Sequence, residues 1–122
     1  MNIKNSFSHK GIEPESNVLY IVGTPIGNLG DISSRALNVL KNVSLIACED
    51  TRQTKKIMSK YSFTNNLICF NKHNSLIKTP RIINDLSMGK SVALVSDAGM
   101  PSICDPGEEL IKEARFNGID II

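Results

Sequence analysis

The sequence predicts an α/β domain with three layers, α/β/α, built on a mainly parallel sheet of about five strands. Short apolar runs alternate with polar or amphipathic segments, which is the order that strand–helix–strand units produce. Loops rich in Gly, Pro, Asn and Asp follow the apolar runs, as they do at the carboxyl ends of strands in open α/β sheets. The length of 122 residues suits one such domain.

The first strand is predicted at residues 18–22 (VLYIV), because a short apolar run ahead of a Gly/Pro loop is typical of a buried strand. The loop 23–30 follows, and either Asp31 or Ser33 is predicted to cap the next helix. That helix places three apolar residues on one face: Ala36, Leu37 and Leu40.

A second apolar run, 43–48 (VSLIAC), predicts the next strand. Asp50 is predicted to cap a polar helix that ends near Tyr61. Residues 67–70 (LICF) form the third predicted strand, and the polar loop 71–74 follows it.

Proline and glycine positions predict the limits of the third helix. Pro80 suits its first turn and Gly89 suits its end, ahead of a fourth strand at 91–95. The predicted buried stripe of this helix consists of Ile82, Ile83 and Leu86.

The last helix has a strong predicted start. Asp105 is placed as its cap and Pro106 at its first position, with Glu108 completing a capping box. Gly118 ends this helix, and residues 119–122 begin a fifth strand.

The domain organisation follows from these limits. Residues 1–17 are polar and aperiodic, and we interpret them as a disordered leader. Because a parallel sheet normally continues beyond such a fifth strand, we expect residues 18–122 to be an N-terminal α/β domain whose second domain is absent.

Composition excludes several classes of protein. No apolar run approaches the ~20 residues that span a bilayer, so no membrane partner is expected. Three scattered cysteines without a C-x-x-C pair argue against a disulfide framework and against a zinc site, and fit a reducing cytoplasm. The net charge of +2 is too small to indicate nucleic acid by itself.

Four polar loops follow the first four predicted strands, and parallel strands bring such loops to one edge of the sheet. They are residues 24–30, 49–52, 71–74 and 96–107. We expect a shared site there, although loops of this composition also occur as simple connections.

Individual residues in these loops keep two interpretations. Asp97 is compatible with binding a ligand hydroxyl or with stabilising a turn. His73 is compatible with proton transfer or contact with a base, and equally with an ordinary surface position. Arg52, followed by Lys55, Lys56 and Lys60, suits either a solvated helix face or an RNA phosphate backbone.

Four strings occur in a specific order: Thr-Pro-Ile-Gly-Asn at 24–28, Glu-Asp-Thr-Arg at 49–52, Ser-Asp-Ala-Gly-Met-Pro at 96–101 and Asp-Pro-Gly at 105–107. With them the chain resembles the ribosomal RNA small subunit methyltransferase I family of the tetrapyrrole methylase superfamily, over about residues 18–122. The resemblance implies an S-adenosylmethionine-dependent enzyme, commonly dimeric, that methylates the ribose 2′-hydroxyl of a cytidine in small-subunit rRNA.

The resemblance also implies two sets of site residues. The cofactor would lie against Ser96, Asp97, Ala98, Gly99 and Met100. The RNA of the 30S subunit would face Thr24, Pro25, Gly27, Asn28, Arg52, His73 and Asn74.

The reaction needs a group that takes the hydroxyl proton, and the chain offers Asp97 and Glu49 ahead of His73. Two other functions stay open at this point. One is methylation of a precorrin-like tetrapyrrole; the other is a non-catalytic domain that only binds a partner or dimerises.

Overall fold

The computed structural model describes residues 13–25, 27–97 and 103–122. Five strands form one sheet in the order β3-β2-β4-β1-β5, and every pairing is parallel. The strands are β1 (Val18–Thr24), β2 (Leu45–Cys48), β3 (Leu67–Cys69), β4 (Val92–Asp97) and β5 (Asp120–Ile121). The helices are the short 3-10 helix η3 (Leu29–Asp31), α1 (Ser34–Asn42), α2 (Thr51–Lys60), α3 (Ser75–Ser87) and α4 (Gly107–Phe116).

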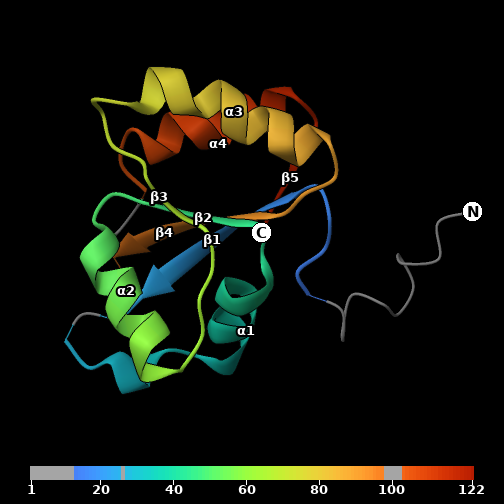
Figure 1. The fold of residues 1–122 in the computed structure, drawn as a ribbon. Helices are drawn as coiled ribbons and strands as arrows, with labels where there is room; N and C mark the ends of the chain where they lie inside the picture. The colour runs from blue at the N-terminus through green and yellow to red at the C-terminus, as the bar shows by residue number, and fades with distance from the viewer. Residues whose placement is uncertain (1–12, 26, 98–102) are drawn as a thin grey trace, which may run out of the picture.

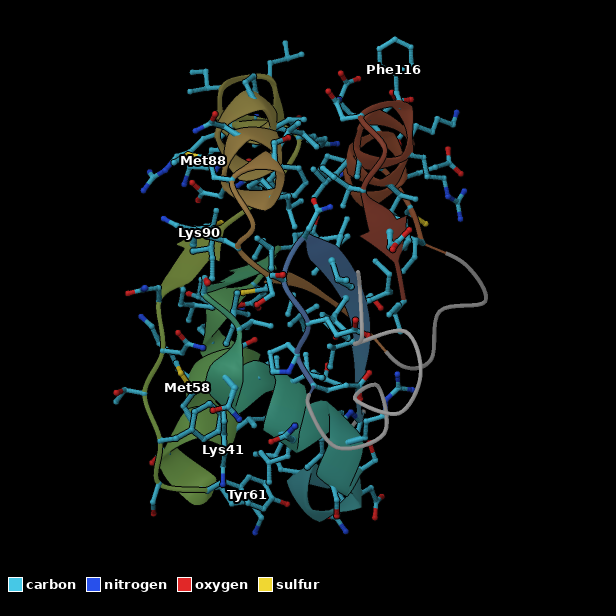
Figure 2. All side chains as sticks on the ribbon, turned by 90° about the vertical axis from the view of Figure 1, so that its right-hand side faces the viewer. Lys41, Met58, Tyr61, Met88, Lys90 and Phe116 are labelled. Atoms are coloured by element: carbon cyan, nitrogen blue, oxygen red, sulfur yellow. The ribbon has the colours of Figure 1, made fainter. Side chains whose placement is uncertain are left out.

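The three-layer α/β/α prediction is confirmed. Figure 1 shows α3 and α4 on one face of the sheet and α1 and α2 on the other. Figure 2 shows α3 and α4 side by side above the sheet, with the side chains of Met88 and Phe116 on their outer surface. These two side chains are 70% and 87% exposed.

The core divides into one apolar cluster on each face of the sheet. In β1, Leu19 belongs to the cluster beneath α3 and α4, whereas Tyr20 and Val22 belong to the cluster against α1 and α2. A strand covered on both faces needs apolar residues at successive positions, which explains the continuous run VLYIV.

Two predicted helix caps are confirmed. Oγ of Ser33 accepts a hydrogen bond from the amide of Ala36 at 3.0 Å, and Oδ1 of Asp50 accepts one from the amide of Arg52 at 2.9 Å. Gly89 and Gly118 follow α3 and α4 with φ values of +94° and +74°, the left-handed conformation that favours glycine after a helix.

The predicted starts of the last two helices are wrong. α3 begins at Ser75, because Asn71 and Asn74 form a tight turn in which Oδ1 of each accepts an amide hydrogen bond from the other. Pro80 therefore lies inside the helix, on its exposed side, where water can replace its missing amide.

At α4, Pro106 occupies the cap position and no side chain caps the helix. The capping box predicted from Asp105 and Glu108 is therefore not formed. The carbonyl of Cys104 instead accepts the amide of Glu108 at 3.3 Å.

Residues 13–17 are the described part of the predicted leader. The carboxylate of Glu13 binds the guanidinium of Arg35 at 2.8 Å, and the amide of Glu15 donates to the hydroxyl of Tyr20 at 2.8 Å. Glu13 and Glu15 therefore contact the domain, and the rest of the predicted leader, residues 1–12, lies outside the described residues.

Candidate active site

The carboxyl ends of β1, β2 and β4 open onto two adjoining cavities. Register places Thr24 beside Asp97 and Cys48 beside Val95, so the residues that follow these strands start from neighbouring points. The larger cavity, of about 470 Å³, is lined by Thr24, Pro25, Gly27, Cys48, Glu49, Asp50, Gln53, Thr54, Val95 and Ser96. The smaller, of about 210 Å³, is lined by Glu49, Phe70, Leu94, Val95, Ser96, Ile103, Cys104, Asp105, Pro106 and Gly107.

Residues from the end of β1 form one wall of the larger cavity. Thr24 is buried, and its hydroxyl donates to the carbonyl of Ser96 at 3.3 Å, which ties β1 to β4 at this point. Gly27 adopts φ +90°, which lets the chain turn without steric strain. Asn28 lies outside both cavity linings, and its side chain caps η3 by accepting the amide of Gly30 at 2.9 Å.

Glu49 lines both cavities and is exposed at the position directly after β2. Its neighbour Asp50 forms an ion pair with Arg52, in which Nη2 of the guanidinium lies 2.8 Å from Oδ2 of the carboxylate. Hydrogen bonds from the Arg52 side chain and amide lower the pKa of Asp50 to about 2. Arg52 is thus held locally, on an exposed surface beside the larger cavity rather than in its lining.

After β3, Phe70 lines the smaller cavity, but residues 71–74 line neither cavity. His73 is exposed, and its amide donates to Oδ1 of Asn71. Asn74 supports the turn instead, since its Nδ2 donates to the carbonyl of Cys69 at 3.0 Å. β3 is the edge strand, separated from β4 and β1 by β2, so its loop starts farther from the shared site.

The residues after β4 are described only in part. Ser96 is half-buried and lines both cavities, and the backbone of Asp97 ends β4 opposite Thr24. The expected cofactor contacts of Ala98, Gly99 and Met100 lie outside the described residues.

Five residues that line the larger cavity were not singled out from the sequence as site residues: Cys48, Asp50, Gln53, Thr54 and Val95. Gln53 and Thr54 belong to the first turns of α2, where Nε2 of Gln53 donates to the carbonyl of Pro25 at 3.5 Å. Thr54 is fully buried on the same helix face as Ile57. The sequence does contain one indication of Thr54: a polar residue occupies a helix position whose spacing from Ile57 predicts burial.

The three cysteines differ in exposure. Burial raises the pKa of Cys48, whereas Cys104 is exposed and Cys69 donates to the carbonyl of Glu49 at 3.2 Å. We expect iodoacetamide at neutral pH to modify Cys104 first and to reach Cys48 only on unfolding, because the thiolate is the reactive form. Peptide mass mapping over time measures this, with Cys104→Ser as the control; early labelling of Cys48 would contradict the burial.

A third and larger groove, of about 720 Å³, runs between α3 and α4. Its lining includes Lys72, Leu76, Ile83 and Glu113 but none of the predicted site residues. The candidate site is therefore the pair of cavities at the carboxyl ends of the strands, where ligands bind in open α/β sheets.

The described part of the chain holds no cluster of three or more His, Cys, Asp or Glu side chains suited to a metal ion. Nor does any helix in that part have the length and apolar content to cross a bilayer.

Comparisons with known proteins show the family of the chain. The sequence profile of the tetrapyrrole (corrin/porphyrin) methylases matches residues 18–122. A ribosomal RNA small subunit methyltransferase I of Thermotoga maritima is 50% identical over 103 residues, covering 84% of this chain and 46% of the relative. One of Halalkalibacterium halodurans is 47% identical over 108 residues, covering 88% and 37%. The chain thus spans less than half the length of these curated relatives.

Solved structures confirm the fold. A cobalt precorrin-4 methyltransferase superposes with a TM-score of 0.70 at 19% identity, over 87% of this chain and 44% of that one. A diphthine synthase does so with a TM-score of 0.64 at 17% identity, over 85% and 42%.

Proposed function

Because the chain belongs to the tetrapyrrole (corrin/porphyrin) methylase family, we propose that it is the N-terminal part of an S-adenosylmethionine-dependent methyltransferase. Its substrate is the ribose 2′-hydroxyl of a cytidine in small-subunit rRNA. The names of curated relatives at 43–50% identity support this substrate over a tetrapyrrole, since the precorrin methyltransferase shares 19% identity and supports the fold alone.

The observation that carries the proposal is the pair of adjoining cavities with a common wall. Glu49, Val95 and Ser96 line both, so two ligands bound there meet at these residues. A group transfer between two substrates needs such contact, because holding the reacting atoms together removes much of the entropic cost of the reaction.

The smaller cavity fits one part of the cofactor. Its about 210 Å³ lies below the roughly 300–1,000 Å³ typical of whole ligand sites, so this chain supplies one side of a pocket. Asp105 and Glu49 place carboxylates around it, suited to ribose hydroxyls and to a sulfonium cation. In the proposal Ser96, Asp97, Ala98, Gly99 and Met100 complete this side.

S-adenosylmethionine, when bound, supplies an electrophilic methyl group. The chain's own part is to orient the ribose and to take its proton as the new oxygen–carbon bond forms and the sulfur–carbon bond breaks. Glu49 is the base in this proposal because it stands where the cavities join, with Asp97 as the other candidate.

The charge on the two helical layers supports RNA on the α1/α2 side. α1 and α2 contain six basic residues and no acidic ones, whereas α3 and α4 contain four of each. Arg35 and Arg52 are paired with carboxylates, so the exposed lysines of α2, Lys55 and Lys56, are the freer charges beside the larger cavity. Figure 2 shows Lys41 of α1 at the same side.

Replacing Lys55 and Lys56 together by alanine is expected to weaken binding of small-subunit rRNA about tenfold and to reduce the slope of log K against log salt by about 1 per lysine. Filter binding across a salt series measures both quantities. The matched control replaces Lys112 and Arg115 of α4, on the other face, and leaves both unchanged. Equal losses in the two double variants would contradict this placement.

The same proposal places the 30S subunit at Thr24, Pro25 and Gly27, which line the larger cavity. The RNA would also contact four residues outside that lining: Asn28, Arg52, and His73 and Asn74 on the loop after β3. It also includes a homodimer, as the resemblance implies. Light scattering of the natural full-length protein tests the dimer. A monomeric mass would refute the dimer and leave the rest of the proposed function unaffected.

Calorimetric titration of S-adenosylmethionine into the natural full-length protein tests the cofactor assignment. Asp97→Ala is expected to weaken binding about tenfold or more, since a charge-assisted contact is lost. Asp120→Asn, at the exposed first residue of β5, serves as the control. Full affinity in Asp97→Ala would contradict the assignment.

A further inference from the structure

Thr54 carries a hydrogen-bonding group that the fold leaves unused. Among the described side chains, its Oγ1 is the buried nitrogen or oxygen atom without a hydrogen-bond partner. The residue is 0% exposed and lines the larger cavity from α2. Buried polar groups are nearly always paired, so an unpaired hydroxyl at a cavity indicates a partner that arrives with a ligand.

No hydrogen bond of ordinary geometry joins this hydroxyl to another described group. Its interaction with the Cys48 thiol lowers the pKa of Cys48, against the larger effect of burial, which raises that pKa. A neutral thiol is a weak acceptor, so an oxygen of a ligand would be the stronger partner for the Thr54 hydroxyl.

Gln53 presents a second polar group at the same cavity. Its Nε2 donates to the carbonyl of Pro25 at 3.5 Å, the long limit of a hydrogen bond, which leaves its other amide hydrogen and its Oε1 for a ligand. This contact also orients the carboxamide, because only the nitrogen end can face a carbonyl. A fixed donor and acceptor side by side match the edge of a nucleobase.

We propose that Gln53 and Thr54 bind the pyrimidine base of the target nucleotide, turned out of the RNA into the larger cavity. The proposal rests on the proposed function and adds to it the residues that select the base. The about 470 Å³ of this cavity falls within the range of small-molecule sites. Enzymes that modify a nucleotide commonly read an extruded base through its hydrogen-bonding edge.

The chemistry distinguishes cytosine from uracil. Cytosine offers an amino donor at N4 beside the acceptor N3, whereas uracil offers the acceptor O4 beside an N3–H donor. The oriented Gln53 carboxamide pairs with the donor and acceptor of cytosine. Against uracil, the same orientation places the amide donor of Gln53 opposite the N3–H donor of the base. The Thr54 hydroxyl donates to O2, which both bases carry, so it contributes binding without selection.

The test uses the natural full-length protein, 30S subunits with the target cytidine, and subunits with uridine at that position. Thr54→Val, of nearly equal volume, is expected to raise KM for the subunit about tenfold while KM for S-adenosylmethionine stays unchanged, and Tm is expected not to fall because a buried unpaired hydroxyl is removed. Thr54→Ser, which keeps the hydroxyl, restores the wild-type KM. Gln53→Leu is expected to reduce the preference for cytidine over uridine about tenfold.

Three results overturn the proposal. They are an unchanged KM for the subunit in Thr54→Val, a loss of cofactor affinity instead, and a Gln53→Leu variant that slows both substrates equally. Absence of methyl transfer by the wild type is a different outcome, since it refutes the proposed function and removes this proposal with it.

Discussion

Replacing Glu49 by glutamine is expected to lower kcat for rRNA methylation about 10²–10⁴-fold, the usual contribution of a general base. The substitution keeps the shape of the side chain that lines both cavities and removes its ability to accept the 2′-hydroxyl proton. KM values are expected to change little, because the base acts mainly in the transition state. Single-turnover methyl transfer with saturating cofactor measures the effect.

Asp50→Asn is the matched control, one residue along the same loop. Asp50 already binds Arg52 and caps α2, and asparagine is an equally good cap, so this variant should keep near wild-type kcat. Full activity in Glu49→Gln combined with loss in Asp97→Asn would move the base to Asp97.

Replacing Leu19 by alanine is expected to lower the free energy of unfolding by about 2–5 kcal/mol, the range measured for large-to-small changes in cores. Leu19 is 0% exposed and pairs with Val92 and Ile121 on the two neighbouring strands. Its side chain belongs to the cluster beneath α3 and α4, so its loss leaves a cavity at the centre of that layer.

Urea denaturation followed by circular dichroism gives the change in unfolding free energy. Leu76→Ala provides the comparison, since Leu76 is 91% exposed and its loss should stay within about 0.5 kcal/mol. Similar losses in the two variants would contradict the assignment of Leu19 to the core.

Local features of the fold were predictable from the sequence. The caps Ser33 and Asp50 involve residues two or three positions apart, so their chemistry is visible in a short string. The alternation of apolar runs and helices was enough for the three-layer architecture. Pro80 misled the prediction because the Asn71–Asn74 turn starts the helix earlier, and proline marks a helix start only by preference.

Features that depend on the sheet order were not predictable. The order places β3 outermost and β4 between β1 and β2, so the loop of His73 lies outside the linings of the two cavities although all parallel loops share one edge. Thr54 was missed for a related reason: its missing hydrogen-bond partner is apparent only when α2 is packed beside the ends of the strands.

The most direct test of the account is methyl transfer from tritiated S-adenosylmethionine by the natural full-length protein to 30S subunits that lack the modification. The account predicts label on the 2′-oxygen of one cytidine, detected as an alkali-resistant linkage at that nucleotide. Label on a precorrin-like tetrapyrrole with none on rRNA would contradict it.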